Sequence, residues 1–144
     1  MNEQETQYSN TDLDLESSHS LATLAQELRK SCDVLHCTEN DAGTWQMTVE
    51  ASHDENTCDR DAGLDITAIL EAIASVSPEA KKEFDSCSRR DFNIGYECWD
   101  SWAYNRGLSH TALRLVVDAR CSISWTLYPM RNADGSPRDD TVVG

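Results

Sequence analysis

Alternation of apolar and polar side chains with a period of two limits the fold of this chain more than any other feature. Residues 12–16, DLDLE, place Leu13 and Leu15 between three carboxylates. Three further stretches alternate in the same way: residues 44–51, 91–99 and 121–129. Neighbouring residues of a strand point to opposite faces, so each stretch predicts a strand with one apolar and one polar face. The pattern therefore predicts a sheet that helices cover on one face and leave open on the other.

Helical spacing of apolar residues separates these strands. Leu21, Leu24 and Leu28 predict a helix that starts near Ser20. Asp65 is the expected N-cap of a second helix, and SPEAKKEF, with Ser77 as N-cap and Pro78 at the first position, begins another helical stretch at once. Ser109 is the expected N-cap of the last helix, and residues 33–37 predict a short strand.

The expected order of elements is β-α-β-β-α-β-α-β, which defines an α+β protein. Its first six elements match the ferredoxin-like split βαβ arrangement, and the last helix and strand form an extension. Residues 1–130 are expected to form a single domain, and residues 131–144 a mobile C-terminal tail. The last strand is expected to point Cys121, Ile123, Trp125 and Leu127 into the core.

Four structural features of the sequence can be compared with known families: the helix start Leu108-Ser109, the leucine-rich helix at Leu113 to Val117, the strand ending Leu127-Tyr128, and upstream Trp45 after Gly43. Through these features the chain, and its C-terminal half above all, resembles a widespread bacterial family of small domains of unknown function. These features are structural, and the family has no established reaction. The resemblance therefore implies a fold and no active-site residues.

Acidity is the strongest compositional signal. The chain has 26 acidic residues against 12 lysines and arginines, a net charge of -14. Residues 1–65 carry -12 of this and residues 66–144 only -2. Such a field repels nucleic acids and anionic membranes and attracts cationic partners. Solubility is the alternative explanation for the acidity.

The location and assembly of the protein can also be predicted. No apolar run approaches the roughly 18 residues that cross a bilayer. The first ten residues, MNEQETQYSN, have neither the basic start nor the apolar stretch of a secretory signal. We expect a cytoplasmic protein, a monomer or weak dimer, that binds no membrane and no nucleic acid.

Motifs for catalysis, metals or cofactors are weak in this sequence. Six cysteines include no CxxC pair, and the tightest group is Cys32, His36 and Cys37. His36 and Cys37 are neighbours on a predicted strand, so they face opposite ways and form no dyad. The segment DRDAGLD lacks the spacing of a calcium loop, and no glycine-rich phosphate loop occurs. We expect no enzyme, no cofactor and no metal site, although a metal or redox role of the Cys32 group stays open.

These observations favour a binding protein that neutralises a cationic protein, such as a bacterial toxin-immunity inhibitor. The expected contact residues are acids of the N-terminal half and an aromatic-arginine loop: Asp12, Asp14, Glu16, Glu50, Asp54, Glu55, Asp59, Asp61, Trp99, Trp102, Tyr104 and Arg106. Two alternatives remain. One is a small-molecule-binding or regulatory domain, and the other is a phage or plasmid inhibitor that mimics the charge of DNA to block a defence nuclease.

Overall fold

The computed structural model describes residues 5–53, 60–99, 103–129, 131–132 and 134–136. In chain order its elements are β1 (Gln7–Ser17), α1 (Ala22–Leu28), β2 (Cys32–Glu39), β3 (Trp45–Ala51), α2 (Ala62–Ala74), α3 (Pro78–Asp85), β4 (Arg89–Glu97), α4 (His110–Asp118) and β5 (Ser122–Tyr128). The fold is α+β, with a mixed, open sheet of five strands. None of the helices in this part of the chain is long and apolar enough to cross a membrane.

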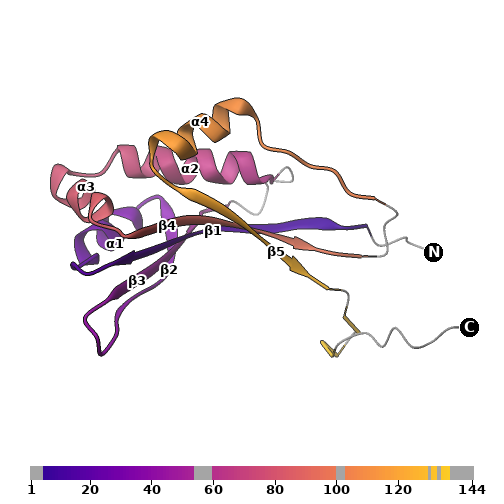
Figure 1. Cartoon of the computed structure of the whole chain (residues 1–144), viewed down its shortest axis with the longest axis horizontal. Helices are drawn as coiled ribbons and strands as arrows, with labels where there is room; N and C mark the ends of the chain where they lie inside the picture. Colours follow the sequence, from indigo (N-terminus) through magenta and orange to yellow (C-terminus); the bar gives the residue numbers. More distant parts are fainter. Residues whose placement is uncertain (1–4, 54–59, 100–102, 130, 133, 137–144) are drawn as a thin grey trace, which may run out of the picture.

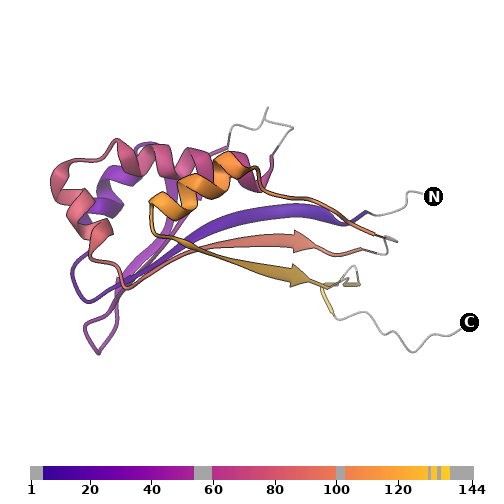
Figure 2. The same ribbon diagram turned by 45° about the horizontal axis from the view of Figure 1, so that its top comes forward.

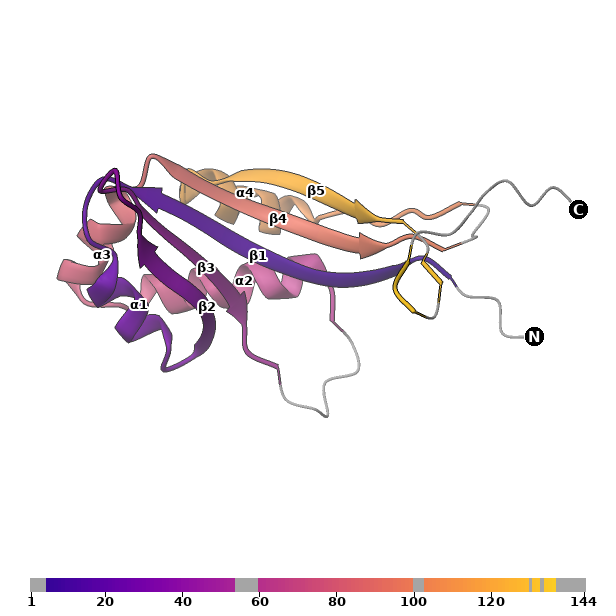
Figure 3. The same ribbon diagram turned by 90° about the horizontal axis from the view of Figure 1, so that it is seen from below.

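The first strand of the chain lies in the middle of the sheet. The strand order is β2-β3-β1-β4-β5, and β1 pairs antiparallel with both β3 and β4. β5 joins the edge of the sheet parallel to β4. All the helices lie on one face (Figures 1 and 2), and the opposite face is open (Figure 3). The predicted one-sided sheet is confirmed.

Two of the three predicted N-cap residues are confirmed. Ser77 and Ser109 cap α3 and α4 as expected, and their side chains accept hydrogen bonds from the backbone of Ala80 and Ala112. The prediction for α2 is wrong, because Asp61 rather than Asp65 is its N-cap. The side chain of Asp61 accepts a hydrogen bond from the backbone N–H of Leu64, so the helix begins earlier and carries Asp65 into its buried first turn.

Two helices replace the single helix in the expected order between the third and fourth strands. α2 ends at Ala74 and α3 begins at Pro78, whose missing N–H and fixed φ suit the first position of a helix. The two helical stretches expected here are thus separate helices, and the observed order has one helix more than the expected β-α-β-β-α-β-α-β.

Apolar side chains on the covered face of the sheet form the core with the inner faces of the helices. Leu13 and Leu15 of β1 are completely buried, and Ile66 and Ile69 of α2 are buried in the same cluster. Burial of each such side chain contributes about 1.5–3 kcal/mol to folding. The leucines of DLDLE thus hold β1 in the sheet and orient its carboxylates towards the open face.

The core prediction for the last strand is wrong at two positions. Trp125 and Leu127 pair in register with Ile94 and Tyr96, which places them on the covered side, yet they are 61% and 64% exposed. They stay uncovered because β5 is an edge strand, and α4 above this edge packs its buried residues Ala112 and Val116 towards α2.

The cysteines also differ from expectation. Periodicity also predicts that Cys98 points inward, but it follows β4 and is half-buried. Cys121 precedes β5 and is half-buried as well, although it packs against the core as expected. Among the cysteines that the structure describes, Cys32 and Cys87 are the buried ones. Burial raises the pKa of the Cys87 thiol to about 12 and that of Cys121 to about 11, so both stay protonated. All the cysteines in the described residues are free thiols.

Candidate functional site

Polar rows cross the open face of the sheet because the strand register aligns them. One row runs from Asp33 through Glu50 and Asp12 to Asn93. We call the carboxylates of this side the acidic face: Asp12, Asp14, Glu16, Asp33, Glu50, Asp91 and Glu97. Residues of four adjacent strands thus bring together acids that lie far apart in the sequence.

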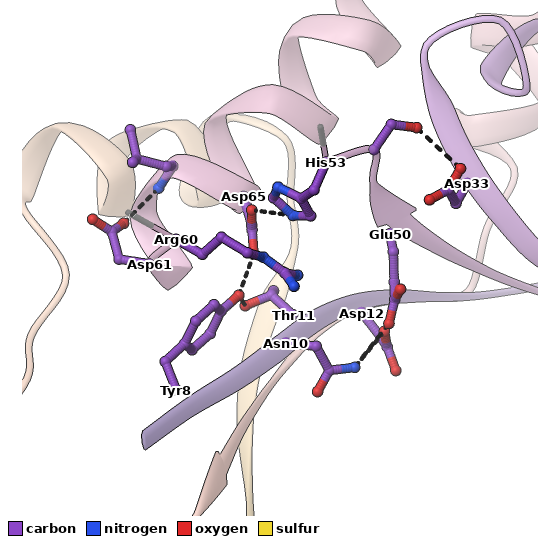
Figure 4. Close-up of polar contacts among 12 residues, drawn as sticks. Tyr8, Asn10, Thr11, Asp12, Asp33, Glu50, His53, Arg60, Asp61 and Asp65 are labelled. Carbon is purple, nitrogen blue, oxygen red and sulfur yellow. Dashed lines mark hydrogen bonds and ion pairs between the residues drawn. The ribbon is translucent and has the colours of Figure 1, made fainter. Parts of the chain in front are cut away.

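Asp12 and Glu50 form the centre of the acidic face. They lie opposite each other on β1 and β3. The side-chain amide of Asn10 donates hydrogen bonds to both, 3.1 Å to Asp12 Oδ1 and 2.8 Å to Glu50 Oε1 (Figure 4). Asn10 reaches this face next to an irregularity in the β1–β4 register, between Tyr8 and Asn10. One amide group therefore holds two carboxyl groups together.

The two carboxyl groups have opposite pKa shifts. Burial, a hydrogen bond to Glu50 and the charge of Glu50 raise the pKa of Asp12 from 3.8 to about 7. Burial also acts to raise the pKa of Glu50, but hydrogen bonds from Asp12 and Asn10 outweigh it and lower that pKa overall. Below about pH 7 the pair therefore shares a proton, carried mainly by Asp12.

We expect the substitution Asp12→Asn to stabilise the protein selectively at high pH. Because the pKa of Asp12 is raised on folding, its contribution to stability is complete below about pH 4 and is lost as the pH rises through about 7. Asparagine keeps a donor towards Glu50 without the charge. In urea unfolding, the free energy of unfolding of the variant relative to the wild type should rise by about 1–2 kcal/mol between pH 5 and 8. This value allows for solvent screening. A difference that does not change over this range, or a carbon-13 titration of the Asp12 carboxyl completed below pH 5, would contradict the assignment.

The other carboxylates of the acidic face are held mainly by neutral donors. Asp14 accepts a hydrogen bond from Thr48 at 2.9 Å. Asp91 accepts one each from Ser122 and Ser124, both at 2.6 Å, and Arg89 approaches it at 3.9 Å. Neutral donors fix the positions of these carboxylates without cancelling their charge. Among the described residues, Asp12, Asp14, Glu16 and Glu50 form no ion pair with a lysine or arginine.

A second polar cluster surrounds the buried carboxylate of Asp65 on the helix side. His53 Nε2 lies 2.9 Å from Asp65 Oδ1, Arg60 lies 3.7 Å from Oδ2, and the hydroxyl of Tyr8 donates a hydrogen bond to Oδ2 (Figure 4). Burial and the hydrogen bond to Asp65 raise the pKa of Tyr8 far above its ordinary value. The cluster joins β1, α2 and the segment after β3, which is a structural role.

A pocket of about 1070 Å³ lies beside this cluster. Its walls are the start of β1, the first turns of α2 and α4, the end of β4 and residues 103–107. Tyr104 makes an edge-to-face contact with Tyr96 at 5.4 Å, and the guanidinium of Arg106 lies 5.4 Å from the Tyr104 ring. The pocket thus offers aromatic and cationic groups, unlike the acidic face.

The residues predicted as contacts fall on two sides of the sheet. Asp12, Asp14, Glu16 and Glu50 lie on the acidic face, whereas Tyr104 and Arg106 line the pocket on the helix side. Asp61 caps α2 and also lines the pocket. Trp99 follows β4, and its backbone N–H donates to Thr6 at 3.1 Å. The remaining predicted contacts, Asp54, Glu55, Asp59 and Trp102, lie outside the described residues.

Sequence reasoning missed several members of the acidic face. Asp91 could have been found, since it alternates with Phe92 at the start of a predicted strand. Asp33 joins the face through the pairing of β2 with β3, which shifts register between Val34 and His36. Periodicity alone does not reveal such a shift.

The group at Cys32 does not converge in the structure. Cys37 pairs in register with the core residue Met47, and His36 with Thr48 on the open face. His36 Nε2 lies 3.4 Å from the hydroxyl of Thr48. Within the described ranges, no group of three or more histidine, cysteine, aspartate or glutamate side chains is arranged to hold a metal ion.

Comparison with known proteins gives no match. No protein-family model matches the chain, and no curated protein or solved structure is significantly similar to it.

Proposed function

We propose that this is a non-enzymatic binding protein that captures a cationic protein on its acidic face. The observation that carries the proposal is the convergence of carboxylates from β1, β2, β3 and β4 on one open sheet face, held mostly by neutral donors. Charges fixed in this way need no rearrangement on binding. Opposed potentials of two proteins accelerate their encounter, to about 10⁸–10⁹ M⁻¹s⁻¹ at low salt.

Affinity requires a buried contact besides the charges, because exposed charges alone contribute little. Tyr128 can supply it on this face. The side chain is 45% exposed, and its ring packs so closely on Gly95 that a Cβ there would lie 3.1 Å from Tyr128 Cε2. We infer that Tyr128 is an aromatic contact at the end of the acidic face. Tyr104 and Arg106 line the pocket on the helix side, so they cannot contact a partner that binds the acidic face.

A cytoplasmic inhibitor of the toxin-immunity type is the form of this function that we favour. The net charge of -14 and the surface carboxylates suit stoichiometric neutralisation of a basic toxin, for example a nuclease. An inhibitor that imitates the charge of DNA towards a defence nuclease would use the same surface. We also propose that β1 to β4 are ferredoxin-like, since their order β2-β3-β1-β4 and antiparallel pairing suit a split βαβ unit.

The test compares two variants with the same net charge. The first carries Asp12→Lys, Asp14→Lys and Glu16→Lys on the acidic face. The control carries Glu71→Lys, Glu79→Lys and Asp85→Lys at exposed positions of α2 and α3. A partner is captured from cells with the wild-type protein, purified, and its association rate with each protein is measured by stopped flow over a range of salt concentrations.

We expect the acidic-face variant to associate at least about tenfold more slowly at low salt and to lose most of its salt dependence. The control should change the rate by less than about threefold. Equal effects of both variants would show that only net charge matters, and an unchanged rate in the first variant would overturn the proposal.

A small-molecule-binding domain is the second candidate function. The pocket lined by Tyr8, Tyr96, Tyr104 and Arg106 favours it. Tyr104→Ala would impair ligand binding under this alternative and leave capture of a protein by the acidic face unchanged.

A further inference from the structure

One edge of the sheet has none of the usual protection against pairing. β5, SISWTLY, is the edge strand, and no described strand pairs with its outer side. Its seven residues include no charged side chain and no proline, and its pairing with β4 runs without a register shift. Trp125 and Leu127 are more than half exposed on one face of this strand. An edge with these properties is a template for another strand.

The opposite edge of the same sheet differs in its charge and in the regularity of its pairing. β2, CDVLHCTE, carries Asp33 and Glu39, and a register shift between Val34 and His36 interrupts its pairing with β3. Charges and bulges are the common means by which sheet edges avoid pairing. The contrast indicates that the bare edge at β5 is specific to that side of the molecule.

We propose that β5 pairs antiparallel with β5 of a second copy of this chain, forming a two-fold symmetric dimer. Full overlap of a seven-residue strand with itself places Trp125 opposite Trp125 of the second copy. Ile123 then faces Leu127, and Ser124 faces Thr126. Apolar side chains meet apolar ones on the covered side, and hydroxyls meet hydroxyls on the open side. A strand that complements itself in this way fits an isologous interface.

The charge distribution allows a second copy to approach at this edge. Two molecules of net charge -14 repel each other, so their contact requires a surface without acids. β5 is uncharged, and α4 above it carries Arg114 and Asp118, which balance. α4 additionally exposes Leu113 and Val117, which are 43% and 70% accessible. Leu113 and Val117 add apolar area on the helix-covered side, where α4 lies over the edge that holds β5 (Figure 3).

The symmetry axis of such a dimer is perpendicular to the sheet. One sheet then continues through both copies, with all the helices on one side. Both acidic faces lie on the other side, separated by the neutral serines and threonines of the two β5 strands.

Sedimentation velocity over about 1–200 μM protein tests the dimer. The wild type should shift from monomer to dimer within this range, and more readily at 0.5 M than at 0.05 M salt because screening weakens the repulsion. Trp125→Lys places two lysines opposite each other at the axis and should raise the dimer dissociation constant at least about tenfold. The matched control is Leu35→Lys, a residue 54% exposed on the edge strand β2, which should leave the dissociation constant unchanged.

Circular dichroism of both variants confirms that they are folded, and Leu127→Lys provides a second test at the β5 edge. A wild-type protein that stays monomeric at every concentration and salt overturns the proposal. Dissociation by Leu35→Lys instead of Trp125→Lys overturns it too, because the interface would then lie at β2.

Discussion

Replacement of Leu13 by aspartate is expected to unfold this protein. Leu13 is completely buried at the centre of the sheet, between β3 and β4. A carboxylate there has no partner and displaces the contacts of the leucine. Loss of the leucine contacts costs about 2–5 kcal/mol, and burial of the unpaired carboxylate costs about 2–7 kcal/mol more. Domains of this size are stable by about 5–15 kcal/mol, so urea unfolding at pH 7 should show a population that is largely unfolded or close to its midpoint without denaturant.

The control is Asp12→Leu, which replaces an acid by leucine at the preceding residue. Asp12→Leu acts on the same strand but on the open face, where it removes the carboxyl group that shares a proton with Glu50. The variant should fold and keep its stability within about 1 kcal/mol of the wild type. Equal destabilisation by both exchanges would contradict the assignment of the two faces.

Removal of the Asp65 carboxylate is the second substitution with a large expected effect. Asp65 is 2% exposed and contacts His53, Arg60 and Tyr8. Asp65→Ala leaves these three groups without their shared acceptor, and we expect a loss of about 3 kcal/mol in the free energy of unfolding. The pKa of Tyr8 should also fall part of the way towards its ordinary value, because burial, the largest cause of its rise, remains while the hydrogen bond to Asp65 and the charge of Asp65 are gone. Ultraviolet titration of the phenol measures this shift.

Asp85→Ala is the matched control for that variant. Asp85 pairs with Lys81 at 3.6 Å on the surface of α3, where the side chains are 63% and 46% exposed. Such a pair contributes at most about 0.5 kcal/mol. A loss at Asp65 no larger than the loss at Asp85 would show that the cluster does not hold β1 and α2 together.

Period-two alternation was sufficient to predict the one-sided sheet. It predicted that Leu13, Leu15, Phe92 and Ile94 point into the core. When one face of a sheet is buried, a shift of one residue in the pairing register would expose every apolar side chain of the strand, so the register is fixed. Serine caps at Ser77 and Ser109 were also predictable, since their hydrogen bonds are local. These features depend on neighbouring residues, which a sequence displays directly.

Features that depend on distant partners could not be predicted. Trp125 alternates like a core residue, but its exposure follows from the position of β5 at the edge of the sheet. Aspartate is a common N-cap residue, so the sequence favoured Asp65 as the cap of α2. Its buried position inside the helix depends on contacts with Tyr8 and His53, which the sequence does not reveal. The separation of the acidic face from Tyr104 likewise follows from which side of the sheet residues 103–107 cross.

The central place of β1 also affects how the chain is synthesised and folds. Leu13 pairs with Val49 on one side and with Phe92, much later in the chain, on the other. A ribosome adds about 5–20 residues per second, so β1 waits several seconds for its second neighbour. During that interval its leucines and unpaired backbone are available to other nascent chains. Carboxylates on every second residue repel such contacts, so we expect the alternation DLDLE to protect the unfinished sheet from aggregation during synthesis.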